Sequence, residues 1–154
     1  RIRKKTASLF ETATWSGSVL GNMDKSENDK LGQFGMNLGL AFQIFDDIRD
    51  FTDLNNKNNK SGKNVGIDIN NGILTLPVIL SLENNYQTNP FYKQIKSNHE
   101  INVKDLGIYL IQEDFIQQAT SIGNTYIEKA INNLKHFKSN EITDILFEIA
   151  NSIK

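Results

Sequence analysis

Only two prolines, Pro77 and Pro90, interrupt this chain of 154 residues. Proline removes a backbone donor and breaks the interior of a helix, so its scarcity leaves room for long helices. Apolar residues recur at three- and four-residue spacings along most of the chain, and the sustained alternation that marks strands is rare. The sequence therefore predicts an all-α architecture.

The spacing of apolar and turn-forming residues also sets the expected boundaries. We expect helices over residues 2–21, 27–52, 72–84, 91–96, 103–112, 114–137 and 141–153. The polar segment 53–71 is expected to be a loop. A loop of that length in a compact domain is usually functional or disordered.

The helix expected over 27–52 is the most informative. Ser26, with Asp29 three residues later, is expected to cap its N-terminus. Three glycines lie inside it: Gly32, Gly35 and Gly39. Each costs roughly 1 kcal/mol relative to alanine in a helix. Close packing against a neighbouring helix is the expected compensation.

The end of this helix carries the segment FQIFDDIRD, Phe42–Asp50. Asp46 and Asp50 are one helical turn apart on one face, and Asp47 is also a neighbour of Asp50. Like charges at this spacing repel, so a cation should compensate them. Mg²⁺ takes oxygen ligands and is usually held by one or two carboxylates together with substrate phosphates. The pattern indicates a Mg²⁺ site, and its plainer interpretation is a solvated acidic face.

Two further segments combine cations with hydroxyl or carboxyl groups. Lys4, Lys5 and Thr6 place two cations beside a hydroxyl, which suits a phosphate contact. In the expected loop, Lys63 lies close to glycines and can close over an anion, and Asp68 can add a metal ligand or a water contact. Taken alone, these segments are equally typical of a basic helix terminus and an ordinary turn.

The composition excludes several classes of function. Lys and Arg number 17 and Asp and Glu 18, a net charge of -1, so nothing favours nucleic acid or an anionic membrane. The absence of Cys excludes disulfides, thiolate catalysis and Cys-ligated metals. No apolar run approaches the ~18 residues of a membrane span. A reducing, cytoplasmic setting is expected.

Four blocks in order along the chain carry a family resemblance. They are KKTASLFE (Lys4–Glu11), LGQFGMNLGLAFQIFDDIRDF (Leu31–Phe51), GKNVGIDI (Gly62–Ile69) and NGILTLPVI (Asn71–Ile79). Together they resemble the C-terminal half of the trans-isoprenyl diphosphate (polyprenyl) synthase family, most closely its bacterial medium- and long-chain members. The resemblance implies an antiparallel helical bundle of the isoprenoid synthase type. Residues 1–154 would be the C-terminal part of a single such domain.

The resemblance also implies a reaction, the condensation of isopentenyl diphosphate with an allylic diphosphate assisted by Mg²⁺. Lys5 and Thr6 would contact the allylic diphosphate, and Gln43 would lie near the reacting prenyl chain. Lys63 would contact diphosphate. The metal residues would be Asp46, Asp47, Asp50 and, through water, Asp68.

Members of this family carry two aspartate-rich motifs that face each other, and this chain contains the second. We therefore expect a piece of a longer prenyltransferase that is inactive alone, and a homodimer, with a heterodimer as the alternative. Other interpretations are a non-catalytic helical subunit that binds diphosphate and Mg²⁺, a class I terpene cyclase, and a plain helical scaffold. The FQxxDD form of the motif favours chain-elongating synthases over cyclases.

Overall fold

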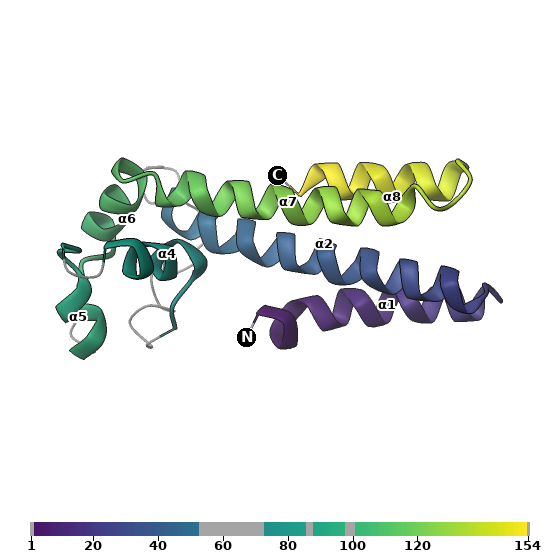
Figure 1. Cartoon of the computed structure of the whole chain (residues 1–154), viewed down its shortest axis with the longest axis horizontal. Coiled ribbons are helices and arrows are strands. Elements are labelled where there is room, and N and C mark those ends of the chain that lie inside the picture. Colours follow the sequence, from purple (N-terminus) through teal and green to yellow (C-terminus); the bar gives the residue numbers. More distant parts are fainter. Residues whose placement is uncertain (1, 53–72, 86–87, 98–100, 154) are drawn as a thin grey trace, which may run out of the picture. The chain divides into compact units, whose positions relative to one another are not determined.

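The computed structural model describes residues 2–52, 73–85, 88–97 and 101–153. Within these ranges every regular element is a helix, which confirms the all-α prediction. The elements are η1 (Arg3–Ala7), α1 (Ser8–Leu20), α2 (Lys25–Thr52), α4 (Leu76–Asn85), α5 (Tyr92–Ser97), α6 (Val103–Gln112), α7 (Phe115–Leu134) and α8 (Glu141–Ser152) (Figure 1). No helix in the described ranges combines the length and apolar character that a bilayer crossing requires.

The chain forms two compact units. The first comprises Arg1–Phe45 and Ile122–Lys154, and the second comprises Asp46–Ser121. In the first unit, α1 runs antiparallel to α2, and α7 runs antiparallel to α8 (Figure 1). The helices α2 and α7 each contribute residues to both units.

The contact between α1 and α2 depends on a glycine and a threonine. A Cβ atom at Gly35 would collide with the Phe10 carbonyl group and with the Thr14 hydroxyl. That hydroxyl crosses the contact and donates to the carbonyl oxygen of Leu31 at 2.7 Å. The two backbones therefore approach closely, as expected from the glycines of α2.

The other two glycines of α2 differ from each other. A Cβ at Gly39 would lie 2.6 Å from the Cα of Ala7, which is closer than real Cβ contacts come. A Cβ at Gly32 would meet only the Trp15 side chain, at an ordinary 3.5 Å. The expectation of close packing is thus confirmed at Gly35 and Gly39 and is wrong at Gly32.

A second helix packs on α2 through another glycine. A Cβ at Gly123 of α7 would lie 2.9 Å from Cζ of Phe45 and 3.3 Å from Cγ2 of Ile44. Both side chains are buried. In the first unit α2 is therefore held by α1 and by α7.

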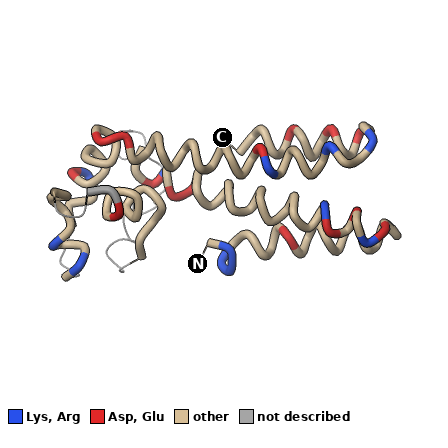
Figure 2. Tube along the Cα trace, viewed as in Figure 1, with Lys and Arg blue, Asp and Glu red and all other residues tan. Residues whose placement is uncertain are grey.

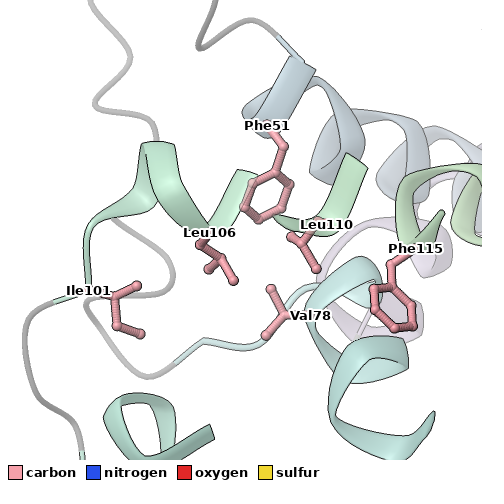
Figure 3. Packing of buried hydrophobic residues seen from close by; sticks show 6 residues of the cluster. All are labelled: Phe51, Val78, Ile101, Leu106, Leu110 and Phe115. Carbon is pink, nitrogen blue, oxygen red and sulfur yellow. The ribbon is translucent and has the colours of Figure 1, made fainter. Parts of the chain in front are cut away.

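The second unit has an apolar core of its own. Its buried members are Phe51, Val78, Ile101, Leu106, Leu110 and Phe115 (Figure 3). Beside this core, the buried Asn89 links α4 to the start of α5. Its amide donates to the carbonyl oxygen and the hydroxyl of Ser81, at 3.3 and 3.1 Å, and its Oδ1 accepts from the Phe91 N–H at 2.9 Å.

The N-terminal cap of α2 differs from the expectation. The Asp24 N–H donates to Oε2 of Glu27 and the Glu27 N–H donates to Oδ1 of Asp24, both at 2.9 Å. This reciprocal pair is a capping box and starts the helix at Lys25, two residues early. The predicted cap at Ser26 was wrong because Ser26 and Asp29 have the same three-residue spacing as the true pair.

The helix expected from residue 72 begins instead at Leu76. Pro77 occupies its first turn, where a missing N–H costs nothing because the first N–H groups of a helix have no partner inside it. Residues 73–75 are not helical. Proline therefore marks the start of α4 and does not interrupt it.

Candidate functional site

Arg3, Lys4 and Lys5 lie on an unusual helical turn. Residues Arg3–Ala7 form a π-helical turn, η1, where the sequence predicts a continuous α-helix. Such turns are rare and frequently mark functional sites. Arg3, Lys4 and Lys5 are exposed on it, and Figure 2 shows positive charge gathered at this end of the chain. The turn therefore offers three cations to an anion in solution.

The structure joins two of the predicted site residues. The Thr6 hydroxyl donates to Oε1 of Gln43 at 2.5 Å, although the two residues are 37 positions apart. Gln43 is 5% exposed and Thr6 is half-buried. The bond ties η1 to α2. It orients a buried amide beside the exposed cations of the turn.

Two aromatic rings accompany this pair. Phe42 precedes Gln43 on α2, and its ring lies 5.6 Å from that of Phe10 on α1, centroid to centroid. Phe42 is 36% exposed, whereas Phe45 is buried. Phe42 therefore presents an accessible apolar surface, and the residue that follows it, Gln43, is a buried polar group.

The three aspartates lie in the last two turns of α2, within the second unit. Asp47 is only 7% exposed, and Asp46 and Asp50 are half-buried. Burial of a carboxylate is costly unless charge or hydrogen bonds compensate it. A solvated acidic face does not describe Asp47, so the plainer interpretation of the motif is weakened.

The donor set fits Mg²⁺ as a partial ligand shell. Carboxylate oxygens suit this ion, which normally keeps open positions for water and phosphate. Across the described ranges, no three acidic or histidine side chains are grouped so that they could hold a metal ion by themselves. Asp46, Asp47 and Asp50 are therefore not gathered into such a group. Lys63 and Asp68 lie outside the described residues.

The family model described as Polyprenyl synthetase matches residues 1–110, more than half of the chain. The chain belongs to the polyprenyl synthetase family. The resemblance carried by the four sequence blocks is thereby confirmed. Every predicted site residue, from Lys5 to Asp68, falls inside the matched range.

Individual members of the polyprenyl synthetase family show the same extent of likeness. The prenyl transferase of Cyanidium caldarium is 36% identical over 148 residues, which are 95% of this chain and 44% of that protein. Heptaprenyl diphosphate synthase component 2 of Bacillus subtilis is 30% identical over 157 residues, 99% of this chain and 43% of that protein. The chain spans less than half the length of either relative.

A solved structure of the family gives the same result. The polyprenyl synthase of Caulobacter crescentus, complexed with calcium and isoprenyl diphosphate, has a TM-score of 0.86 at 28% identity. The match covers 99% of this chain and 47% of that chain. The isoprenoid synthase bundle predicted from the sequence is confirmed, and this chain accounts for about half of it.

Proposed function

We propose that this chain is the C-terminal part of a single polyprenyl synthase domain. The complete protein is then a trans-prenyltransferase of isoprenoid biosynthesis, which condenses isopentenyl diphosphate with an allylic diphosphate. The observation that carries the proposal is the hydrogen bond between Thr6 and Gln43. It joins the residues that would match the family's Lys-Thr and FQxxDD motifs, in a chain that the family model matches over residues 1–110.

Residues of this chain have separate roles in the proposed reaction. Lys5, exposed on the π turn, binds the diphosphate. The one hydroxyl proton of Thr6 is donated to Gln43, so Thr6 acts through that amide. Gln43 is held by Thr6 and faces the reacting end of the prenyl chain. These groups act where negative charge develops on the departing diphosphate, which is where electrostatic stabilisation lowers a barrier.

The metal part of the proposal rests on α2. Asp46, Asp47 and Asp50 would hold Mg²⁺, with Asp68 acting through water. When bound, this ion neutralises diphosphate charge and so assists cleavage of the allylic C–O bond. Lys63 would add a second cation at the diphosphate.

We also propose a cytoplasmic, dimeric protein. We expect a homodimer, and the name component 2 of the relative from Bacillus subtilis supports a heterodimer as the alternative. The cysteine-free composition suits a reducing compartment. Light scattering of the purified protein, alone and with a candidate second component, distinguishes the two assemblies.

A second candidate function is a non-catalytic subunit that binds diphosphate and Mg²⁺. It is favoured by the name of the Bacillus subtilis relative, which is component 2 of a heptaprenyl diphosphate synthase. Such a subunit would show Mg²⁺-dependent binding of inorganic pyrophosphate without turnover.

One assay separates these functions. Labelled isopentenyl diphosphate and an allylic diphosphate are supplied to the longest polypeptide that the coding sequence specifies. We expect Mg²⁺-dependent incorporation of the label, and its loss in the double variant Asp46→Asn, Asp50→Asn. Asp29→Asn, an exposed change near the start of the same helix, is the matched control and should retain activity.

The remaining outcomes each decide a point. Pyrophosphate binding without incorporation selects the non-catalytic subunit. Product formed from the allylic diphosphate alone selects a cyclase. Unchanged Mg²⁺-dependent pyrophosphate binding in the double variant overturns the assignment of the metal site.

A further inference from the structure

Gly39 is the point at which the π turn touches α2. An added Cβ there would lie 2.6 Å from the Cα of Ala7 and 3.1 Å from two side-chain atoms of Phe10. Ala7 is completely buried and is the last residue of η1. No side chain beyond hydrogen fits at position 39 without moving the turn, because the nearest atom belongs to the backbone.

The same turn makes a second attachment to α2. Thr6, which precedes Ala7, bonds to Gln43, which follows Gly39 by one helical turn. The turn is therefore fixed on α2 at two successive levels, by a backbone contact at Gly39 and by a hydrogen bond at Gln43. Moving the first attachment displaces the second, since adjacent residues form the two contacts.

We propose that Gly39 is a positioning residue for the reaction. Because Gly39 has no side chain, the π turn can lie against α2. This brings the Thr6 hydroxyl within hydrogen-bond distance of Gln43 and determines the position of the Lys5 ammonium group. The inference rests on the function proposed above, and extends it to a residue that touches no substrate. A methyl group at this position must push Ala7 away by about 1 Å to reach an ordinary contact of ~3.6 Å.

Gly32 provides a matched comparison. It lies two turns before Gly39 on the same helix, also facing α1, but the nearest atoms to its added Cβ belong to the Trp15 side chain, at ordinary distances of 3.5 Å and more. The change Gly32→Ala therefore makes the same chemical alteration without moving the π turn. A general effect of alanine on α2 would appear in both variants, whereas a positioning effect would appear only in Gly39→Ala.

The test measures kcat and KM for incorporation of labelled isopentenyl diphosphate by the complete protein. A displacement of about 1 Å in a site costs roughly 100-fold in rate. We expect Gly39→Ala to lower kcat by about that factor while changing KM by less than about threefold, and Gly32→Ala to leave both within about twofold. Equal losses in the two variants, or full activity in Gly39→Ala, would overturn the inference.

A second measurement is independent of turnover. In isotope-labelled protein, the methyl group of Thr6 and the side-chain amide of Gln43 should give a nuclear Overhauser cross-peak. We expect this peak to persist in Gly32→Ala and to be lost in Gly39→Ala, and its persistence in Gly39→Ala would overturn the positioning role. If the unsubstituted protein shows the peak but incorporates no label, the proposed function fails and the geometric link stands.

A variant on the other side of the contact guards against misfolding. Ala7→Val adds bulk where the turn meets α2, and it should reproduce the loss of kcat and of the cross-peak. Circular dichroism establishes that each variant is helical. If Gly39→Ala does not fold, Ala7→Val decides the matter, and normal kcat in a folded Ala7→Val variant would overturn the inference.

Discussion

Replacement of Asn89 by alanine should destabilise the second unit measurably. The side chain is 6% exposed and bridges α4 and α5 with both ends of its amide. The Asn89 Nδ2 group donates to the carbonyl oxygen and to the hydroxyl of Ser81. The Asn89 Oδ1 atom accepts a hydrogen bond from the Phe91 N–H. The amide reaches back eight positions along the chain to Ser81, so the prediction depends on the structure and not on a local sequence signal.

The magnitude follows from what the change leaves behind. The Ser81 hydroxyl keeps its own acceptor, the Val78 carbonyl oxygen at 2.8 Å, so it is not stranded. The Phe91 N–H loses the acceptor that Asn89 supplies. With a net ~1 kcal/mol for each of the two bonds to Ser81 and about 1–3 kcal/mol for the Phe91 N–H left without an acceptor, we expect a loss of about 3–5 kcal/mol in the free energy of unfolding.

Urea denaturation followed by circular dichroism provides the measurement. A shift of the midpoint at constant slope would report a change of stability and not of compactness. Asn151→Ala is the matched control, because among the described residues its exposed amide donates to the Phe147 carbonyl oxygen of its own helix. We expect that control to stay within about 0.5 kcal/mol of the unsubstituted chain. A loss in Asn89→Ala no larger than in the control would refute the assignment of a structural role to this amide.

Three further changes test local geometry. Thr14→Val removes the bond from the hydroxyl to the Leu31 carbonyl oxygen and should cost about 1 kcal/mol in thermal denaturation, while Thr14→Ser should recover most of it. Asn140→Ala destroys the capping box at the start of α8 and should cost about 1 kcal/mol, with faster hydrogen exchange in the first turn of that helix. Asp114 has a φ of 60°, so Asp114→Val should cost about 1–2 kcal/mol and Asp114→Gly should not destabilise; equal midpoints for those two variants would contradict this.

Capping residues next to apolar periodicity predicted some helix boundaries at the correct residue. The helix expected over 103–112 is α6, Val103–Gln112, and it begins where the Asn102 side chain accepts from the N–H groups of Lys104 and Asp105. The start of α8 at Glu141 is set in the same way by Asn140. A capping side chain and the apolar pattern that follows it lie within a few residues of each other, so the sequence alone can predict the helix start.

Other features depend on contacts between distant parts of the chain. Nothing in the residues of η1 distinguishes a π turn from an α-helix, and the contact with Gly39 exists only once α1 has packed on α2. Thr6 and Gln43 were each identified by resemblance, yet their bond requires the antiparallel register of the two helices. The burial of Asp47 against the half-burial of Asp46 is likewise invisible in a pattern that treats the two alike.

The π turn also changes how the cations are spaced around the helix axis. Each residue of an α-helix advances the chain by about 100° around the axis. A π turn holds about one residue more per turn than an α-helix does. Deleting one residue from Arg3–Ala7 would let the helix close as one regular α turn. Because the two kinds of turn cover nearly the same angle, the residues before the deletion would keep nearly the same direction relative to α1. The extra residue is therefore absorbed within Arg3–Ala7: it changes the angular spacing of Lys4, Lys5 and Thr6 around the helix axis, and the register of α1 is kept.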